Sequence, residues 1–396
     1  MNYILVVNAG SSSIKFRLYS ENNLVEIASA LCERIEIDGL FKISYQVNDK
    51  LEKFEEKTNF SSHEVAIDYC LKKLVDLKIV NNLNEIIGVG HRVVQGGEIS
   101  QSSLIDTKVL AEIEKCIKLA PLHNKPELEV IKIINKKIPN SKPVAVFDTS
   151  FHTTIPKLNN YYPIPKKWVD SFKIKKYGFH GTSYRYIYEK MESIIKKGRP
   201  LNLIVCHLGN GASICCIKNG KSFDTTMGFT PMAGLIMGTR CGDIDPSIAD
   251  YLINQEKNSA TAVFNSYNKE SGLKAICGSS DFRDINANVL PGNEFEFARD
   301  IFAQKVANTI SVYLNHLENK IDGIVFTGGI GENDDIVRNI ICKKIFVKKI
   351  SVNASKNKLK YDDYKKISGL FSPIKVYAVR TNEELKIAQD TKSFIK

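Results

Sequence analysis

Two arginines of this sequence stand in glycine-rich segments where they could bind an anion. Arg92 lies in His91–Gly97, directly after an apolar stretch, and Arg240 lies in Met237–Pro246 among glycines. A lone arginine is usually a surface charge, but glycine-rich loops permit a close approach of the backbone to a ligand. Because guanidinium groups match planar carboxylates and phosphoryl oxygens, the two arginines indicate a site for such groups.

Two glycine-rich turns could hold a phosphate chain through their backbone N–H groups. Gly209–Gly211 adjoins the end of a predicted strand, and Gly328–Asn333 follows a strand and opens a helix. Neither is a Walker A loop, because no Gly-Lys-Ser/Thr follows, and the second lacks the GxGxxG spacing of the dinucleotide fingerprint. For either turn taken alone, a plain structural turn is the alternative.

A carboxylate and two histidines complete the candidates drawn from residue type and position. Asp148 follows the apolar stretch Pro143–Phe147, which predicts a buried strand that delivers a carboxylate at its end. His180 precedes a glycine and a predicted helix, which favours contact with a ligand. His123 ends a predicted helix, where capping the last carbonyl groups is an equal alternative. The seven histidines show no HxxxH or HxH spacing, which argues against a metal site formed by histidines.

The elements that must position these residues alternate between strands and helices. The first unit is predicted to be a strand over Ile4–Val7, a polar turn over Asn8–Ser13 and a second strand over Ile14–Tyr19. A similar unit is predicted about 200 residues later, with strands over Leu203–Cys206 and Ala212–Ile217 joined by the turn His207–Gly211. A further hairpin turn is predicted at Asn219–Gly220. Helices are predicted from Ser61 or Ser62 to Leu77, after Thr107, from Pro126, over Glu294–Glu318, from about Asn333 and near Thr381, and further strands over Ile321–Phe326 and Val376–Val379. This order indicates an α/β architecture with an internal duplication.

Composition and charge exclude several other classes of protein. A chain of 396 residues with 43% hydrophobic and 25% charged residues fits a soluble protein of two domains, with a boundary near residue 150. The longest apolar runs are too short to span a membrane, and the N-terminus is not that of a signal peptide. The net charge of +11 comes from dispersed lysines without a nucleic-acid motif. Nine cysteines without CxxC spacing favour a reducing cytoplasm.

Ten short segments, taken in order, resemble the acetate kinase family along nearly the whole chain. They are NAGSSSIKF from residue 8, HRVVQGGE from 91, LAPLHN from 119, VAVFDTSFH from 144, YGFHGTS from 177, CHLGNGAS from 206, DTTMGFTP from 224, MGTRCGDIDP from 237, FTGGIGEN from 326 and TNEEL from 381. The sequence departs from the family pattern at Gln95, Lys125, Tyr184, Ala233 and Cys241. None of these five is assigned a catalytic role.

The resemblance implies an α/β fold of two duplicated ribonuclease-H-like domains, of the actin, Hsp70 and sugar kinase type, that flank a nucleotide cleft. Residues 1–150 would form the N-terminal domain, on which a C-terminal helix at about 384–396 packs, and residues 151–383 the nucleotide-binding domain. The implied activity is a reversible transfer of the ATP γ-phosphoryl group to acetate, giving acetyl phosphate and ADP, with Mg²⁺ or Mn²⁺ as the metal. A cytoplasmic homodimer without nucleic-acid or membrane partners is expected.

The same resemblance assigns roles to individual residues. Asp148, His180 and Arg240 would be catalytic, Arg92 would hold the substrate carboxylate, and Val94, Leu122, Phe179 and Pro231 would form the apolar pocket for its methyl group. The residues implied to bind ATP are Lys15, His207, Leu208, Gly209, Asn210, Gly211, Asp281, Phe282, Arg283, Gly329, Ile330, Gly331, Glu332 and Asn333. Asn8 and Glu383 would hold Mg²⁺, and His123 is an additional candidate.

Physical reasoning refines the expected chemistry. Acetate is ionised at neutral pH, so the nucleophile needs no general base, and Asp148 is expected to orient Mg²⁺, water or an arginine. The main catalytic contributions would be positioning and preorganised positive charge from Arg92, Arg240, His180 and the metal. Three alternatives remain: a propionate or butyrate kinase of the same family, a non-enzymatic ATPase-fold module that binds a partner, and a sugar kinase.

Overall fold

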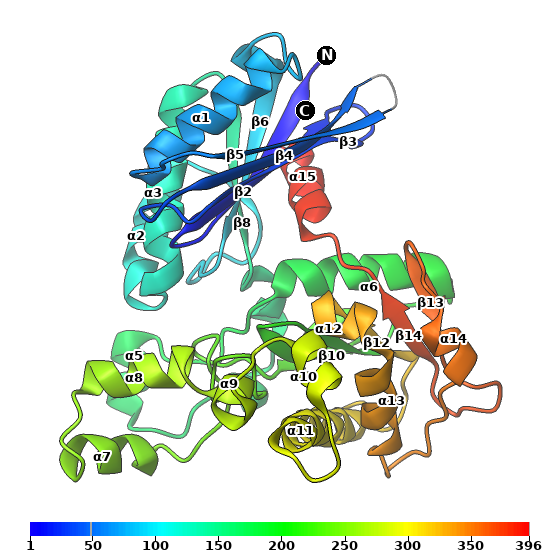
Figure 1. Ribbon diagram of the computed structural model, residues 1–396. Helices are drawn as coiled ribbons and strands as arrows, with labels where there is room; N and C mark the ends of the chain where they lie inside the picture. The colour runs from blue at the N-terminus through cyan, green and yellow to red at the C-terminus, as the bar shows by residue number, and fades with distance from the viewer. Residues whose placement is uncertain (48–49, 396) are drawn as a thin grey trace. The chain divides into compact units, whose positions relative to one another are not determined.

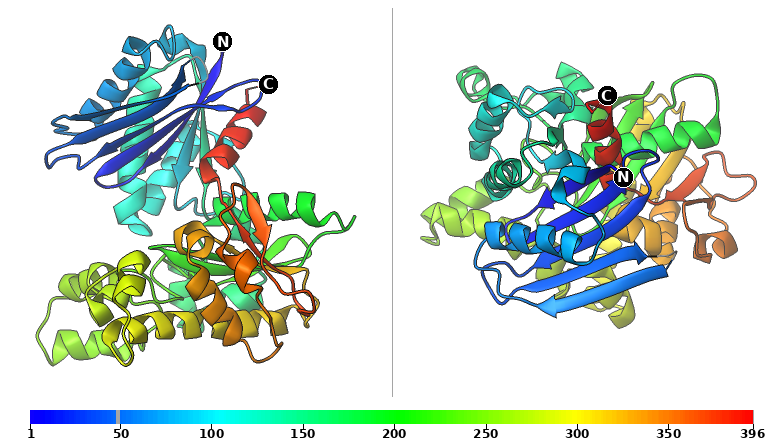
Figure 2. Two further views of the ribbon diagram at one scale, coloured as in Figure 1. Left: turned by 45° about the vertical axis from the view of Figure 1, so that its right-hand side comes forward. Right: turned by 90° about the horizontal axis from the view of Figure 1, so that it is seen from above.

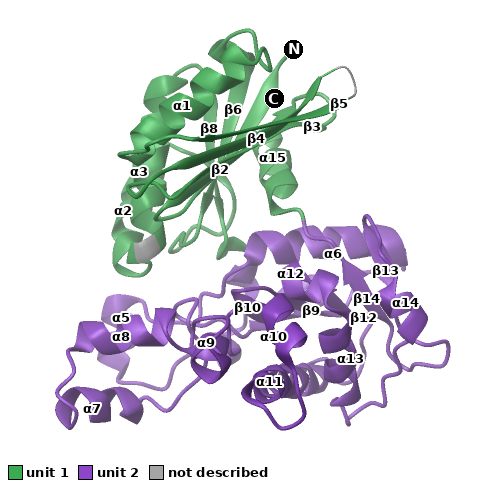
Figure 3. Cartoon of the chain, in the orientation of Figure 1, with its two compact units in different colours: residues 1–150, 382–396 green, residues 151–381 purple. Residues whose placement is uncertain are grey.

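The computed structural model describes residues 1–47 and 50–395, except for the side chain of Leu122. Within these residues the chain forms two compact units, one of residues 1–150 and 382–396 (unit 1) and one of residues 151–381 (unit 2) (Figure 3). Each unit is a mixed β-sheet with helices packed against it (Figure 1). The α/β class expected from the sequence is therefore confirmed. Among the described residues, no helix has the length and apolar character needed to cross a membrane.

The sheet of unit 1 has eight strands in the order β5-β4-β3-β2-β1-β6-β8-β7. Strands β1 to β5 form an antiparallel meander, β6 and β8 run parallel to β1, and β7 is an antiparallel edge strand. The strands are β1 (Tyr3–Ala9), β2 (Ser13–Ser20), β3 (Glu26–Glu33), β4 (Leu40–Val47), β5 (Lys50–Lys57), β6 (Ile86–Val93), β7 (Ser103–Leu104) and β8 (Lys142–Phe147).

Helices cover both faces of this sheet (Figures 1 and 2). They are α1 (His63–Asp76), α2 (Thr107–Lys115), α3 (Pro121–Lys137) and α15 (Glu383–Ser393), with short 3-10 helices at Leu83–Glu85, Cys116–Lys118 and Ser150–Thr154. Helix α1 begins where Ser62 accepts a hydrogen bond from the backbone N–H of Val65. The apolar sides of α1 and α3 pack with Leu5 and Val7 of β1 in one core. Helix α15 packs against Ile4 and Val6 on the opposite face.

The sheet of unit 2 has six strands in the order β11-β10-β9-β12-β14-β13. Strands β9, β10 and β11 are antiparallel, β12 and β14 run parallel to β9, and β13 is an antiparallel edge strand. The strands are β9 (Leu203–Leu208), β10 (Ala212–Lys218), β11 (Lys221–Thr225), β12 (Gly323–Thr327), β13 (Tyr364–Lys366) and β14 (Val376–Val379).

Helices also pack on both faces of the second sheet. Helix α6 (Gly181–Ile195) packs in one core with β9, β10, β12 and β14, and α11 (Glu294–His316) contacts β9 and β10. The other helices of unit 2 are α4 (Lys157–Asn160), α5 (Lys166–Phe172), α7 (Ser247–Asn254), α8 (Ala260–Lys269), α9 (Gly272–Cys277), α10 (Phe282–Asn288), α12 (Gly328–Asn333), α13 (Asp335–Lys343) and α14 (Ala354–Lys358).

The two sheets repeat one pattern, which confirms the duplicated fold expected from the sequence. The order β3-β2-β1-β6-β8 in unit 1 matches β11-β10-β9-β12-β14 in unit 2, with the same parallel and antiparallel pairings. The predicted hairpin turn at Asn219–Gly220 is present, with φ values of 51° and 77°. In each unit, the parallel strands deliver their carboxyl ends to one edge of the sheet.

Two helix boundaries predicted from the sequence are wrong. The third helix begins at Pro121 and contains Pro126 in its interior. Pro121 takes the first helical position, which proline favours, whereas Pro126 lies beyond the first turn. The 3-10 turn Cys116–Lys118 ends before Pro121 and lets the helix begin there. After β12, helical structure begins at Gly328 as α12 rather than near Asn333.

Candidate active site

In unit 1, the candidate residues Asn8, Arg92 and Asp148 come together at the carboxyl ends of parallel strands. Asn8 lies near the end of β1, Arg92 near the end of β6, and Asp148 directly after β8. The strand register pairs Val7 with His91 and Arg92 with Val146, so the three positions are neighbours along one sheet edge. The sheet topology thus explains why residues far apart in the sequence meet here.

Arg92 is held by a bidentate ion pair with Asp148. Its Nη2 and Nε lie 2.6 Å and 3.3 Å from Asp148 Oδ2 and Oδ1, and its Nη1 donates to Asn8 Oδ1 at 3.3 Å. The Asp148 side chain is 1% exposed, whereas that of Arg92 is 22% exposed. Burial alone would lower the pKa of Arg92, but the carboxylates of Asp148 and Glu383 outweigh it, and the pKa is raised. Arg92 therefore stays cationic, and part of its side chain is exposed.

Glu383 adds a second carboxylate beside Arg92. It lies in the first turn of α15, after Asn382, whose side chain caps that helix by accepting from Leu385 N–H. Burial raises the pKa of Glu383 above its usual range. The positive charge of Arg92 acts to lower this pKa, and the negative charge of Asp148 acts to raise it. The amide oxygen of Asn8 and the carboxylate of Glu383 are oxygen donors of the kind that Mg²⁺ prefers, and one or two carboxylates plus substrate phosphates are its usual protein ligands. The residues therefore fit the expected metal.

The residues predicted to form the acetate pocket are divided between the two units. Val94, 3% exposed, directly follows β6 in unit 1, and Phe179, 2% exposed, and the half-buried Pro231 lie in unit 2. Leu122 lies in the first turn of α3, and its side chain is outside the described part of the structure. His123 also lies in this first turn and not at a helix end. The capping of C-terminal carbonyls considered for His123 is therefore wrong, because the helix starts rather than stops there.

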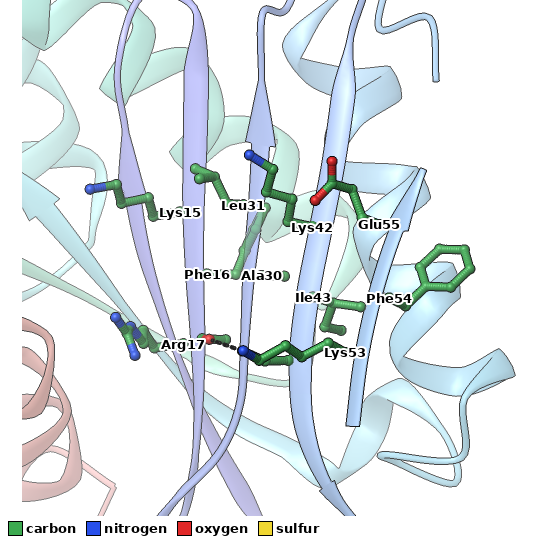
Figure 4. Close-up of a pocket in the computed structure, with 12 residues that line it drawn as sticks. Lys15, Phe16, Arg17, Ala30, Leu31, Lys42, Ile43, Lys53, Phe54 and Glu55 are labelled. Carbon is green, nitrogen blue, oxygen red and sulfur yellow. Dashed lines mark hydrogen bonds between the residues drawn. The ribbon is translucent and has the colours of Figure 1, made fainter. Parts of the chain in front are cut away.

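Lys15 is the one residue predicted to bind ATP that belongs to unit 1. It lies on β2, opposite Asn8 of β1, and its side chain is exposed. A hollow of about 460 Å³ on this face of the sheet is lined by Lys15, Arg17, Lys42 and Lys53, among others (Figure 4). Two of these cations have carboxylate partners, since Arg17 pairs with Glu26 and Lys42 pairs with Glu33.

In unit 2, His180 and Arg240 converge on the turn at Gly211. A Cβ atom placed on Gly211 would lie 3.6 Å from His180 Nε2 and 3.7 Å from Arg240 Nη1. Arg240 Nη1 also donates to the carbonyl of Pro231 at 3.2 Å. His180 precedes α6 in the left-handed conformation, with φ of 58°, which costs a residue with a side chain on the order of 1–2 kcal/mol. The backbone conformation of His180 therefore lowers the stability of the fold, while His180 and Arg240 both lie close to Gly211.

Hydrogen bonds fix the ring of His180. Its Nδ1 lies 2.8 Å from Ser213 Oγ, and its ring stacks on that of His207 with centroids 4.3 Å apart. Ser213 Oγ also bonds to the hydroxyl of Tyr184 at 2.5 Å. Tyr184, noted as a departure from the family pattern, is fully buried and contacts the same Ser213 hydroxyl as His180.

The two glycine-rich turns lie at the same edge of the unit 2 sheet. Strand β9 runs into Gly209–Gly211, β12 runs into Gly328, and the register pairs His207 with Thr327. Gly328 has φ of 74°, and a Cβ there would come within 2.8 Å of the carbonyl oxygen of Leu208. The close approach of the two turns therefore requires glycine at this position.

A hollow of about 740 Å³ opens beside these turns, which is a size typical of small-molecule sites. Its lining includes eight of the residues predicted to bind ATP: Gly209, Asn210, Asp281, Phe282, Arg283, Gly329, Ile330 and Asn333. At the rim, Arg283 forms a bidentate pair with Asp281, which holds the pKa of Asp281 down at about 2. The hollow thus joins glycine backbone, apolar side chains and an arginine.

Several residues of this hollow were not predicted from the sequence. Ser280, Asn286, Asp334, Asp335 and Ile336 line it beside the predicted residues. Ser280 directly precedes a predicted segment, and Asp334, Asp335 and Ile336 directly follow one, so adjacency in the sequence was the signal for these four residues. Asn286 lies three residues after Arg283 on α10, where helical spacing was the signal. Conversely, the predicted residues His207, Leu208, Gly211, Gly331 and Glu332 do not line the hollow and lie on the adjoining strand, turn and helix.

Sequence and structure comparisons agree on one family. The profile of the Acetokinase family matches residues 3–389. An acetate kinase of Mycoplasma pneumoniae is 50% identical over 395 residues, covering 98% of each chain, and one of Mycoplasma mycoides is 49% identical over 397 residues, covering 99% of this chain and 100% of the relative. Among solved structures, a propionate kinase from Francisella tularensis matches with a TM-score of 0.92 at 38% identity, over 99% of this chain and 100% of that one. Porphyromonas gingivalis acetate kinase matches with a TM-score of 0.91 at 34% identity, over 100% of both chains.

Proposed function

We propose, on the premise that the chain belongs to the acetokinase family, that it catalyses the reversible, Mg²⁺-dependent transfer of the ATP γ-phosphoryl group to acetate. The family identifies the chain as a phosphotransferase of the acetate kinase type. The observation that carries the proposal is the ion pair between the partly exposed Arg92 and the buried Asp148. In the other unit, a hollow of about 740 Å³ is lined by Gly209 and Asn210, next to the glycine that His180 and Arg240 approach.

Unit 1 supplies the residues that we assign to the acceptor. Arg92 would bind the acetate carboxylate through its guanidinium group, since pairing with a carboxylate is the geometry that arginine favours. Val94 would contact the methyl group, together with Leu122, Phe179 and Pro231. The bidentate contact of Asp148 with Arg92 supports the third of its expected roles, the orientation of an arginine. Proton abstraction is not needed, because acetate is already ionised.

Unit 2 supplies the residues that we assign to the nucleotide and to the transferring group. The backbone of Gly209–Gly211 and Gly329 would approach the phosphate chain, and Phe282 and Ile330 would contact the base. His180 and Arg240 would donate to the equatorial oxygens of the phosphoryl group, whose negative charge must be stabilised during in-line transfer. The shared approach of both side chains to Gly211 supports this pairing.

Mg²⁺ would be held by Asn8 and Glu383, with ATP completing its ligands, and Mn²⁺ would be accepted in its place. When bound, the metal would neutralise charge on the phosphate oxygens. The raised pKa of Glu383 means that a cation must compete with a proton for this carboxylate near neutral pH. Metal affinity should therefore rise with pH in this range.

The size of the acceptor is the finer part of the proposal. Val94 is buried, and its side chain leaves less room for an acceptor than a smaller side chain would. One methylene in an apolar pocket changes binding by only about 1–3 kcal/mol, so acetate and propionate are expected to differ modestly. The similarity to the Francisella tularensis propionate kinase makes a propionate kinase the second candidate.

One assay separates these possibilities. ADP release from Mg·ATP would be measured with acetate, propionate and butyrate as acceptors. We expect the highest kcat/KM with acetate and a shift toward propionate in a Val94→Ala variant. A higher kcat/KM with propionate would establish the second candidate, and ATP binding without stimulation by any carboxylate would instead favour the partner-binding ATPase module.

Assembly and location are further parts of the proposal. Family resemblance supports a homodimer, and sedimentation of the purified enzyme at assay concentration would test it. All nine cysteines are free thiols, and eight of them are buried, which is in keeping with a reducing cytoplasm. We propose no nucleic-acid or membrane partner.

A further inference from the structure

The loop Val94–Gly97, which follows Arg92 and Val93, is held by a polar network beneath it. Four consecutive backbone N–H groups each donate to a side-chain oxygen: Val94 to Glu127 Oε2 at 3.0 Å, Gln95 to Asn124 Oδ1 at 3.1 Å, Gly96 to Thr149 Oγ1 at 3.3 Å and Gly97 to Gln95 Oε1 at 3.0 Å. Such side-chain acceptors replace the partners that a regular strand would offer. The loop is therefore fixed residue by residue.

Two of these acceptors come from one face of α3. Asn124 and Glu127 are three residues apart, which places them side by side on a helix, and they are 0% and 2% exposed. Asn124 also returns a hydrogen bond, because its Nδ2 donates to the carbonyl of Gln95 at 2.8 Å. Glu127 and Asn124 therefore clamp the backbone at Val94 and Gln95, directly after the strand that carries Arg92.

Glu127 is an unusual residue for a purely structural contact. Burial raises the pKa of its carboxyl group to about 8, although the Val94 N–H and Arg92 act to lower it and Asp148 to raise it. Its second oxygen, Oε1, has no hydrogen-bond partner among the described residues. A buried polar group that is only half satisfied costs stability. Fold stability alone would favour an apolar side chain in this place.

We propose that Glu127 and Asn124 are positioning residues for the acceptor site, which hold the Val94–Gly97 loop so that Arg92 and Val94 present a fixed carboxylate-binding edge. The inference rests on the proposed function, in which Arg92 and Val94 bind acetate. Neither residue is assigned a contact with the substrate, and neither belongs to the set of residues named from the sequence. Their effect should fall on acetate rather than on ATP, since the nucleotide residues other than Lys15 lie in unit 2.

The test compares three variants of the full-length enzyme with a matched control. Glu127→Leu removes the acceptor of the Val94 N–H, Glu127→Gln keeps an oxygen in the same place, and Asn124→Ala removes both contacts with Gln95. Glu129→Gln is the control, since Glu129 lies exposed on the same helix. KM and kcat would be measured for acetate at saturating ATP and for ATP at saturating acetate.

We expect the acetate KM to rise about tenfold in Glu127→Leu and Asn124→Ala, the scale of one lost buried hydrogen bond. The ATP KM should stay within about twofold, and Glu127→Gln and Glu129→Gln should resemble the parent enzyme. An unchanged acetate KM, or an equal rise in both KM values, would overturn the inference, since general loosening of the fold does not select one substrate. If Glu127→Leu does not fold, Asn124→Ala carries the same expectation. Failure of the proposed function itself would show earlier, as a parent enzyme that acetate does not stimulate.

Discussion

Units 1 and 2 share one sheet topology but place different chemistry at its carboxyl edge. Unit 1 presents side chains there, with Asn8, Arg92 and Asp148 joined by hydrogen bonds. Unit 2 presents glycine backbone at Gly209–Gly211 and Gly328–Gly329. A duplicated fold therefore fixes where a ligand can bind, while the residues at the strand ends decide what it binds. A carboxylate acceptor is bound by a planar guanidinium group. A phosphate chain is bound by glycine backbone, which it can approach closely.

Each unit also buries polar groups that hold its loops. In unit 1, side-chain oxygens on α3 accept hydrogen bonds from the N–H groups of Val94 and Gln95. In unit 2, Glu332 Oε1 accepts from Gly328 N–H and Thr381 N–H, and Arg338, 1% exposed, donates from Nη1 to the carbonyl of Gly331 at 2.9 Å. The loop of unit 1 is thus fixed through its N–H groups, whereas α12 in unit 2 is fixed through both an N–H group and a carbonyl.

The largest expected effect that would distinguish the roles of the two units is a loss of kcat on replacement of Arg240. Replacing it by alanine should lower kcat on the order of 10²–10³, because it removes a preorganised donor to the charge that develops in the transition state. The KM for acetate should change much less. Arg240→Lys should recover only part of kcat, because an ammonium group lacks the planar fork. Lys269→Ala, which removes an exposed charge of unit 2, is the control for net charge. A near-parental kcat in Arg240→Ala would remove the catalytic role from Arg240 and leave His180 as the catalytic candidate of unit 2.

The next largest effect concerns Arg338, whose Nε and Nη2 donate to the side chain and carbonyl of Asn357 at 2.8 Å and 2.9 Å. Arg338→Met should lower the free energy of unfolding of unit 2 by about 3 kcal/mol, because buried carbonyl groups lose their donor. It should also raise the ATP KM and leave that of acetate nearly unchanged. Urea unfolding followed by fluorescence of Trp168, the single tryptophan and a residue of unit 2, would measure the change. Lys343→Met on the same helix is the matched control, since Lys343 is exposed.

The strand ends of both units could be predicted from the sequence. Apolar stretches that stop at a polar or glycine-rich segment placed Asn8, Arg92, Asp148 and Gly209 correctly on strands or directly after them. The signal is strong because a buried parallel strand is apolar throughout, so its end is visible in the sequence. The repeated hairpin in each half likewise indicated the duplication that the sheet orders confirm.

The supporting residues could not be predicted in the same way. A glutamate on a helix and an arginine near a helix start are usually exposed, so nothing in the sequence marked Glu127 or Arg338 as buried. The predicted start of the third helix at Pro126 also hid the burial of Glu127. A helix that began there would place Glu127 in its first turn, where carboxylates are common. Burial of these residues depends on contacts with Val94 and Gly331, which are distant in sequence.

Glu127 also predicts how the stability of unit 1 depends on pH. Its pKa is about 8 in the folded protein and roughly 4.3 in an unfolded chain, so the folded state binds the extra proton between these values. Stability should therefore fall as pH rises from about 4.5 to 8, by at most about 1.4 kcal/mol per pH unit. Calorimetry of the parent and of Glu127→Gln should show a Tm difference that grows in favour of the variant with pH. A constant difference would mean that Glu127 is ionised throughout and that its neighbours Arg92 and Asp148 accommodate the charge.

The smallest expected effect tests whether unit 2 binds phosphate through its backbone. Gly329 has no atom within 4 Å of the position that a Cβ would occupy, and its φ lies outside the left-handed region. Gly329→Ala should therefore fold normally and gain up to about 1 kcal/mol, because alanine favours a helix over glycine. If the phosphate chain passes close to this backbone, the new methyl group should raise the ATP KM about fivefold, a cost of on the order of 1 kcal/mol. A raised Tm together with a raised ATP KM would separate ligand approach from fold stability. An unchanged ATP KM would move the phosphates away from Gly329 and leave Gly209–Gly211 as the turn that approaches them.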